Sequence, residues 1–187
     1  MAELLIKPAS GAVVHDITPQ SAGWEHVGFG LHDLAAGGVI DGSGDGNELC
    51  IVLLSGAVSV SAGDVDFGHI QGRESVFDGV PAHAFYVPMQ TAWKVEATTA
   101  SEVAICRAPG IDGVHPPRHI TPDSMSLESR GSGANTRHVC NILPETEPAD
   151  SLLVVEVITP SGNWSSYPPH KHDTDDLPNE SYLEETY

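Results

Sequence analysis

Apolar residues recur along the chain in short runs, and several of them alternate with polar residues. The run Leu49–Leu54 is continuous and rich in β-branched side chains, whereas Ala57–Ser61 alternates strictly. Alternation places every second side chain on one face of a strand, and a short continuous apolar run fits a strand that is buried on both faces. The Ser55-Gly56 joint between the two runs predicts a hairpin or a bend between two strands.

Further short apolar runs follow as far as residue 106, each bounded by glycine, proline or aspartate. Strands at such regular spacing are typical of an antiparallel barrel or sandwich. The pattern therefore predicts an all-β fold. The runs are Val65–Phe67, Ser75–Phe77, Ala84–Val87, Ala92–Glu96 and Glu102–Cys106.

The second part of the chain begins after a segment, 108–117, that is rich in glycine and proline and best fits a linker. Beyond it we expect strands at 136–143 and 152–159. On the latter, Val155 and Val157 share one face because successive strand residues point to opposite sides.

Charge and cysteine content narrow the function classes. The 187 residues include 26 acidic and 8 basic ones, a formal net charge of −18 that makes nucleic acid and anionic membranes poor partners. No apolar run approaches the roughly 20 residues of a membrane span, and the start lacks a leader pattern. Cys50, Cys106 and Cys140 are isolated and odd in number, which fits thiols in a reducing compartment. We therefore expect a cytoplasmic protein.

A His-Lys-His sequence near the end of the chain is the strongest candidate for chemistry. On an extended strand, His170 and His172 point to the same face. The segment Tyr182–Tyr187 follows an acidic loop and is predicted to pair back as another strand. Two histidines facing a carboxylate offer a divalent transition metal mixed nitrogen and oxygen ligands with open positions. The competing interpretation is an ordinary solvated His-Lys-His in a polar loop.

Two adjacent residues, Glu184 and Glu185, could supply the carboxylate, but on a strand they face opposite sides. If Glu185 faces inward, Leu183 and Tyr187 face inward with it, whereas the reverse register buries a less apolar set. Burial of the more apolar set favours Glu185 as the metal ligand and leaves Glu184 as the alternative.

These motifs also carry a family resemblance. His170-x-His172, a spacer and Glu185 resemble the first metal motif of the cupins, in which Glu lies on the next barrel strand. The sequence around these motifs closely resembles the sequences of the 5-deoxy-glucuronate isomerase family. These are bicupins of inositol catabolism, related to 4-deoxy-threo-hexosulose-uronate ketol-isomerase. The segments that carry this closer resemblance are Ser165–Asp173, Tyr182–Tyr187, Asn135–Arg137, Asn141–Glu145 and Ser151–Val157.

The resemblance implies a bicupin of two jelly-roll barrels. Residues 1–120 would form an N-terminal barrel without a metal site, and residues 121–187 the first strands of a metal-binding C-terminal barrel. In the family a further histidine follows these motifs, so we expect the second barrel of this chain to be incomplete. Its open sheet edge could pair with another subunit, and the 187-residue chain would hold metal weakly or not at all and be inactive.

The first barrel contains two isolated counterparts of the cupin ligands. Glu48 falls near the position of a cupin glutamate, and His83 lies in a proline-bearing segment that resembles the second cupin motif. One histidine and one glutamate rarely hold a metal without further donors. We therefore expect this barrel to serve in packing and dimerisation.

The resemblance further implies an aldose–ketose isomerase that converts 5-deoxy-glucuronate to 5-dehydro-2-deoxy-gluconate. A cation held by His170, His172 and Glu185 would stabilise the enediolate charge while a base moves the proton. Zinc, manganese and iron are not distinguished by these ligands. Arg137 could bind the substrate carboxylate bidentately, or be a solvated charge on its strand.

The catalytic base is not identified by the sequence. Tyr167, Asp173 and Glu184 lie near the motif, although each fits a surface loop equally well. Two alternative functions also stay open. One is a non-enzymatic cupin that binds a sugar acid or a metal, including an inactive fragment, and the other is an iron-dependent cupin dioxygenase.

Overall fold

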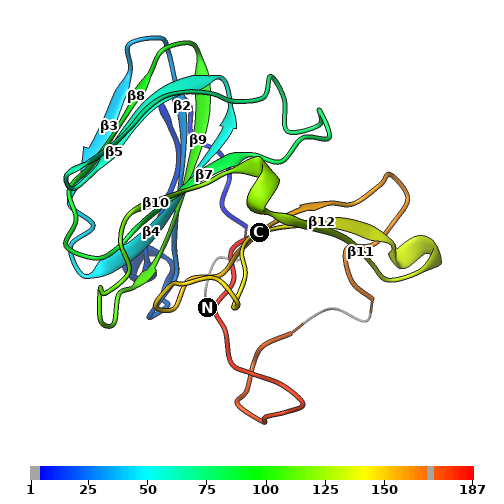
Figure 1. Ribbon diagram of the computed structural model, residues 1–187. Coiled ribbons are helices and arrows are strands. Elements are labelled where there is room, and N and C mark those ends of the chain that lie inside the picture. Colours follow the sequence, from blue (N-terminus) through cyan, green and yellow to red (C-terminus); the bar gives the residue numbers. More distant parts are fainter. Residues whose placement is uncertain (1–4, 168–170) are drawn as a thin grey trace.

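The computed structural model describes residues 5–167 and 171–187, and strands dominate it (Figure 1). The helical elements in these residues are α1 (Pro19–Ala22) and short 3₁₀ turns at Pro122–Ser124 and Gly133–Asn135. In the described parts of the chain, no helix has the length and hydrophobicity of a membrane span. The predicted all-β class is confirmed. The strands are β1 (Val13–Ile17), β2 (Gly28–Leu34), β3 (Val39–Gly42), β4 (Asn47–Ser55), β5 (Ala57–Ala62), β6 (Val65–Gln71), β7 (His83–Val87), β8 (Trp93–Ala97), β9 (Ser101–Pro109), β10 (Arg118–Ile120), β11 (Ser126–Arg130), β12 (Arg137–Leu143) and β13 (Val154–Ile158).

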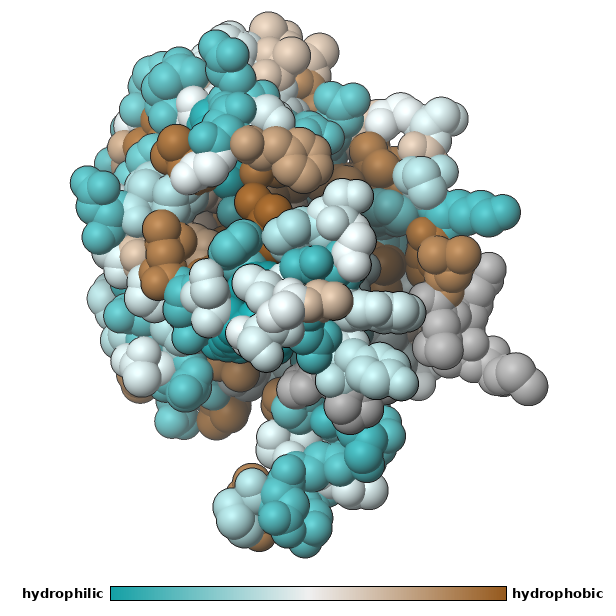
Figure 2. All heavy atoms as spheres, turned by 90° about the vertical axis from the view of Figure 1, so that its right-hand side faces the viewer, coloured by the Kyte–Doolittle hydropathy of each residue, from teal (hydrophilic) through white to brown (hydrophobic). Residues whose placement is uncertain are grey.

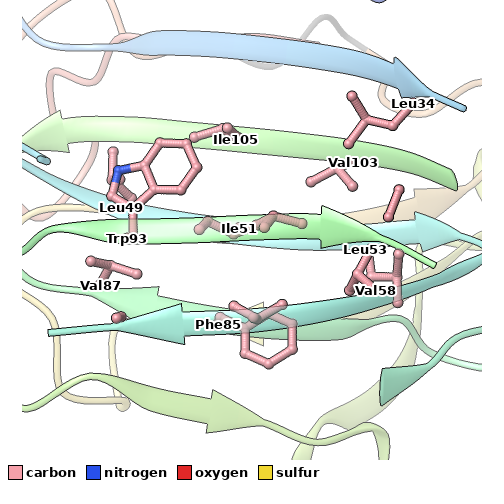
Figure 3. Packing of buried hydrophobic residues seen from close by; sticks show 14 residues of the cluster. Leu34, Leu49, Ile51, Leu53, Val58, Phe85, Val87, Trp93, Val103 and Ile105 are labelled. Carbon is pink, nitrogen blue, oxygen red and sulfur yellow. The ribbon is translucent and has the colours of Figure 1, made fainter. Parts of the chain in front are cut away.

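Two antiparallel sheets face each other and form a barrel from the first part of the chain. Their strand orders are β1-β2-β9-β4-β7-β10 and β3-β8-β5-β6. The inner faces supply a core that includes Leu49, Ile51 and Phe85, none of them more than 2% exposed (Figure 3). Strand β8 shows how alternation builds this core, because its odd-numbered residues are buried while Lys94 and Glu96 pair outside.

The Ser55-Gly56 joint is a bend that carries the chain from one sheet to the other, since β4 and β5 belong to different sheets. Gly56 has φ +89°, a conformation that L side chains rarely adopt. A Cβ at this position would also overlap the carbonyl oxygen of Ala100. Glycine is therefore required where the two sheets are joined.

A third sheet, β11-β12-β13, packs on the outer face of the six-stranded sheet and forms a second core there. Strand β4 contributes to both cores. Its residues Leu49 and Ile51 face into the barrel, while Cys50 and Val52 face the three-stranded sheet. The continuous apolar run in the sequence is explained by this burial on both sides.

The two faces of β13 differ as the alternation predicted. Val154 is 8% exposed and packs in the second core, whereas Val155 and Val157 are 48% and 41% exposed. Figure 2 views the side of the molecule that carries the three-stranded sheet, where apolar side chains reach the surface.

Two predicted strands do not form. Around Ser75–Phe77 the carboxylate of Asp78 accepts the backbone N–H groups of Glu74 and Ser75, which makes a turn in place of a ladder. The segment 182–187 is irregular as well, and the N–H of Tyr182 donates to the Asp175 carboxylate. In both segments side-chain acceptors take the N–H groups that a neighbouring strand would have used.

Candidate functional site

The face of the three-stranded sheet turned away from the second core carries Arg137, Val139 and Asn141 of β12, of which Val139 is buried and the other two are partly exposed. The cross-strand partners of Val139 and Asn141 are Val157 and Val155, so these residues share that face. Arg137 is also close enough to the end of the chain for its positive charge to lower the pKa of the Tyr187 hydroxyl, against the larger effects that raise it. In Figure 1 this final segment, drawn in red, follows a loop that projects from the rest of the molecule.

His172 is oriented by a hydrogen bond from its Nδ1 to the carbonyl oxygen of Ser181, 2.7 Å away. A carbonyl can only accept, so Nδ1 carries the proton and the lone pair of the neutral ring is on Nε2. This nitrogen lies 3.9 Å from Oε1 of Glu185. The imidazole therefore presents its metal-binding nitrogen toward a carboxylate, and Nδ1 makes the kind of outer bond that orients metal-ligating histidines.

Glu185 is the carboxylate on the same side as His172 and Tyr187. Its Oε2 accepts a hydrogen bond of 3.2 Å from the Tyr187 hydroxyl. Desolvation of that hydroxyl raises the pKa of Tyr187, although most of the residue is exposed; the Glu185 carboxylate raises it further and Arg137 opposes the rise. The structure thus brings His172, Glu185 and Tyr187 together, and the charge of Arg137 acts on Tyr187.

Glu184 points the other way and is bound to the first barrel. Its carboxylate accepts the backbone N–H groups of Glu25, His26 and Val27 at 2.8, 2.7 and 2.9 Å. Desolvation alone would raise the pKa of Glu184, but these three donors outweigh it and hold the pKa below its ordinary value. Glu184, the alternative ligand and candidate base, is therefore already engaged in structural hydrogen bonds.

The acidic loop between the histidine and glutamate segments has its own hydrogen bonds. Glu180 pairs with Lys171 at 2.7 Å and accepts the N–H groups of Asp173 and Thr174. The Lys171 hydrogen bond is the main reason that the pKa of Glu180 falls to about 2. Figure 2 shows this part of the chain as a hydrophilic projection.

The described donors fit a divalent metal in type and in partial geometry. Two ligands about 2.1 Å from one ion lie about 3.0–3.5 Å apart, so the 3.9 Å between His172 and Glu185 requires a closure of about 0.4–0.9 Å. His170, the third predicted ligand, lies outside the described residues. Within residues 5–167 and 171–187 no group of three ligand side chains is close enough to hold an ion.

The other base candidates, Tyr167 and Asp173, are both exposed. Tyr167 is 69% exposed and its ring packs against Trp164, with 5.9 Å between the centroids. Asp173 is exposed at the start of the acidic loop. Neither contact pattern gives these residues a proton-transfer partner.

In the first barrel, Glu48 does not face the interior. It is fully buried between the barrel and the third sheet, where it accepts the Tyr86 hydroxyl at 2.7 Å. It also accepts the N–H groups of Asp150, Ser151 and Leu152 at 2.8, 2.6 and 2.6 Å. Glu48 is therefore a structural link between the two parts of the chain.

His83 has a partner that sequence reasoning missed. Its Nδ1 lies 2.9 Å from Nε2 of His119 on the neighbouring strand β10, and the His119 ring stacks on Phe85. Desolvation lowers the pKa of both histidines; Asp123 opposes this at His83, and His83 adds to it at His119. The spacing of 36 residues gave no sequence signal for this pair.

A separate pocket of about 420 Å³ lies between the 73–81 segment and the third sheet. Arg73 and Glu156 line it and form a bidentate ion pair with each other. His172, Glu185 and Arg137 do not line this pocket, and its charged groups are already paired. It offers no ligand set for a metal.

Comparison with known proteins adds an independent line of evidence. The sequence matches the KduI/IolB family over residues 4–187. A 5-deoxy-glucuronate isomerase of Geobacillus kaustophilus is 53% identical over 171 residues, covering 91% of this chain and 62% of that protein. A protein of the same name from Halalkalibacterium halodurans is 45% identical over 194 residues, covering 100% of this chain and 72% of its own length.

A solved structure agrees over the same range. The crystal structure of an IolB-like protein from Salmonella typhimurium matches with a TM-score of 0.92 and 47% identity, covering 97% of this chain and 69% of that one. The chain spans about 62% of the length of the two Geobacillus relatives. With sequence and fold in agreement along almost all of its residues, the chain belongs to the KduI/IolB family.

Proposed function

We propose that this chain supplies the N-terminal barrel and part of the metal site of an isomerase acting on 5-deoxy-glucuronate, the activity named for its relatives. The observation that carries the proposal is the approach of Nε2 of His172 to Oε1 of Glu185, 3.9 Å apart. An aldose–ketose isomerisation moves a hydrogen between two adjacent carbons, and negative charge develops on the neighbouring oxygens as it does so.

His170, His172 and Glu185 are the proposed ligands of a divalent cation. When bound, such a cation supplies Lewis-acid stabilisation of the charge on the substrate oxygens. The Ser181 carbonyl fixes the His172 ring so that Nε2 faces the site, and the Tyr187 hydroxyl orients the Glu185 carboxylate. These bonds reduce the freedom that the two ligands would lose on binding a metal.

Arg137 is the proposed anchor for the substrate carboxylate. Its planar guanidinium can donate two parallel hydrogen bonds to a carboxylate, which fixes both the position and the orientation of a sugar acid. Its only hydrogen bond among the described residues is a long one, 3.5 Å, to the Asn135 carbonyl. A substrate carboxylate could replace this bond at little cost.

The sheets support the proposed division of the chain. Residues 1–120 would be a barrel without a metal site, and the proposed boundary coincides with the end of β10, the edge strand of the six-stranded sheet. Residues 121–187 would begin the metal-binding unit, and its edge strands β11 and β13 support association with another subunit. The described cysteines are all unpaired thiols, which supports a reducing, cytoplasmic location.

Matched histidine and carboxylate variants test the proposal. The experiment compares His172→Ala and Glu185→Gln with His69→Ala, an exposed histidine of the first barrel, in this chain and in the chain extended to the length of its Geobacillus relative. We expect isomerisation of 5-deoxy-glucuronate by the extended protein, with metal content and turnover lost together in the first two variants only. Stoichiometric metal in the His172→Ala/Glu185→Gln double variant would rule the site out.

A further inference from the structure

Glu184 and Glu185 are neighbours in the chain with carboxylates held in different places. Glu185 lies beside His172, and Glu184 reaches the backbone of residues 25–27. Those residues directly precede β2, which pairs with both β1 and β9 in the large sheet of the barrel. The two side chains thus connect the candidate metal site with a rigid part of the first barrel.

The bonds of Glu184 make a complete anion cradle. Oε1 accepts the N–H of Glu25, and Oε2 accepts those of His26 and Val27, all within 2.7–2.9 Å. Three consecutive N–H groups that converge on one carboxylate form a short, charge-assisted set of hydrogen bonds. Both oxygens are used, so Glu184 fits the role of an anchor and not that of a metal ligand.

The segment has few other supports. Residues 181–187 pair with no strand. The other bonds of its backbone are the Ser181 carbonyl bond to His172, the bond from the N–H of Tyr182 to the Asp175 carboxylate and a bond of 3.3 Å from the N–H of Leu183 to the His172 carbonyl. Without Glu184, the residues next to Glu185 would gain freedom that metal binding must remove again.

We propose that Glu184 is a positioning residue: by binding the backbone of residues 25–27 it holds Glu185 beside His172. This inference rests on the proposed metal site. It gives the first barrel, which is proposed to lack a metal site, a specific role, because the backbone of this barrel provides the fixed point that positions Glu185. Removing an outer-shell contact of this kind commonly lowers metal affinity about 10- to 100-fold.

The chain offers a matched control in Asp150. Its Oδ2 accepts the N–H groups of Ile111, Asp112 and Gly113 at 2.8, 3.3 and 3.1 Å, which is the same type of cradle away from the candidate site. Loss of this cradle should cost stability in the same way as loss of the Glu184 cradle. It should leave the metal site unchanged.

The experiment titrates Zn²⁺ into the purified chain and its variants by competition with a chromophoric chelator, and records the His172 imidazole signals by NMR without metal. We expect Glu184→Ala to weaken zinc binding about 10- to 100-fold, with the conservative Glu184→Gln in between and Asp150→Asn within twofold of the parent chain. The His172 signals should shift in both Glu184 variants and stay in place in Asp150→Asn.

Each outcome supports or refutes the positioning role of Glu184. Zinc affinity and His172 signals in Glu184→Ala that match those of Asp150→Asn would overturn this role. If the parent chain binds no zinc, the His172 signals alone test the positioning role of Glu184, since they report the geometry around His172 without metal. A Glu185→Gln variant with unchanged zinc affinity would instead refute Glu185 as a ligand, and with it the proposed site, whatever the result for Glu184.

Discussion

Glu48 gives the sharpest stability prediction, because a single buried carboxylate joins the two parts of the chain. Its Oε1 accepts the N–H groups of Ser151 and Leu152, and its Oε2 accepts the N–H of Asp150 and the Tyr86 hydroxyl. Glu48→Gln keeps the shape of the side chain but replaces one oxygen by an NH₂ group. If the NH₂ group takes the place of Oε2, the Tyr86 hydroxyl can turn and accept from it, but the N–H of Asp150 is left facing a donor.

The expected magnitude has two parts. The hydrogen bond of Asp150 to a charged acceptor is lost, which costs about 1.5–3 kcal/mol, and the remaining bonds weaken because their acceptor is now neutral. Together these losses should lower the free energy of unfolding by about 3–6 kcal/mol, a large part of the roughly 5–15 kcal/mol typical of a folded protein. For a chain of this size, where 1 kcal/mol shifts Tm by about 2–4 °C, we expect a fall in Tm of roughly 6–24 °C.

Calorimetry and urea unfolding measure the effect. Tyr86→Phe removes only the hydroxyl bond and should cost about 1.5–3 kcal/mol, less than Glu48→Gln, because the carboxylate keeps its charge and its three backbone donors. Glu102→Gln, at an exposed glutamate with a single bond of 3.4 Å to Ser55, is the control and should melt like the parent chain. A Glu48→Gln variant that melts within about 2 °C of the parent would refute the reasoning.

Three further predictions concern other contacts that join distant parts of the chain. Arg73→Met leaves the Glu156 carboxylate without its partner and should lower the free energy of unfolding by about 3–5 kcal/mol, measured with urea. The double variant Arg73→Met/Glu156→Leu should regain most of that loss. Equal losses in the two variants would contradict this reasoning. The pKa values of His83 and His119 are lowered in the folded state, so the unfolded chain binds more protons just below its ordinary histidine pKa, and stability should rise as pH increases toward about 6.5. This rise in Tm should flatten in His83→Gln/His119→Gln, and an unchanged pH profile would exclude the pair as its source. Gly56→Ala places a Cβ at φ +89° against a backbone carbonyl and should cost about 3 kcal/mol or prevent folding; a parent-like Tm would show that the bend can relax.

The sequence alone was sufficient for the strands whose pattern is local. The alternation in β8 and β13 depends only on neighbouring residues, and so does the continuous apolar run of β4. The strands expected at Ser75–Phe77 and Tyr182–Tyr187 were wrong because acceptors on other residues, Asp78 and Asp175, take their N–H groups. Apolar periodicity contains no information about such competition.

The candidate site likewise combines features that the sequence predicted with features that depend on the tertiary structure. The His-x-His spacing and the alternation of Glu184 and Glu185 could be read from the chain, and burial favoured Glu185 as the inward carboxylate. Where these side chains lie was decided by contacts with residues far away in the sequence. Glu184 is held by N–H groups 157 to 159 residues earlier, and this leaves Glu185 on the side of His172.

The sequence by itself determined the all-β class and the family, and it predicted the metal ligands that are proposed for the site. Only the tertiary structure decided that Glu48 is a buried link and that His83 pairs with His119. The physical reason is that local periodicity fixes which face of a strand a side chain occupies, while the partner on that face depends on how the sheets come together. Charged and hydrogen-bonding residues can satisfy many partners equally well, so their roles are settled only when folding brings one of those partners within about 3 Å.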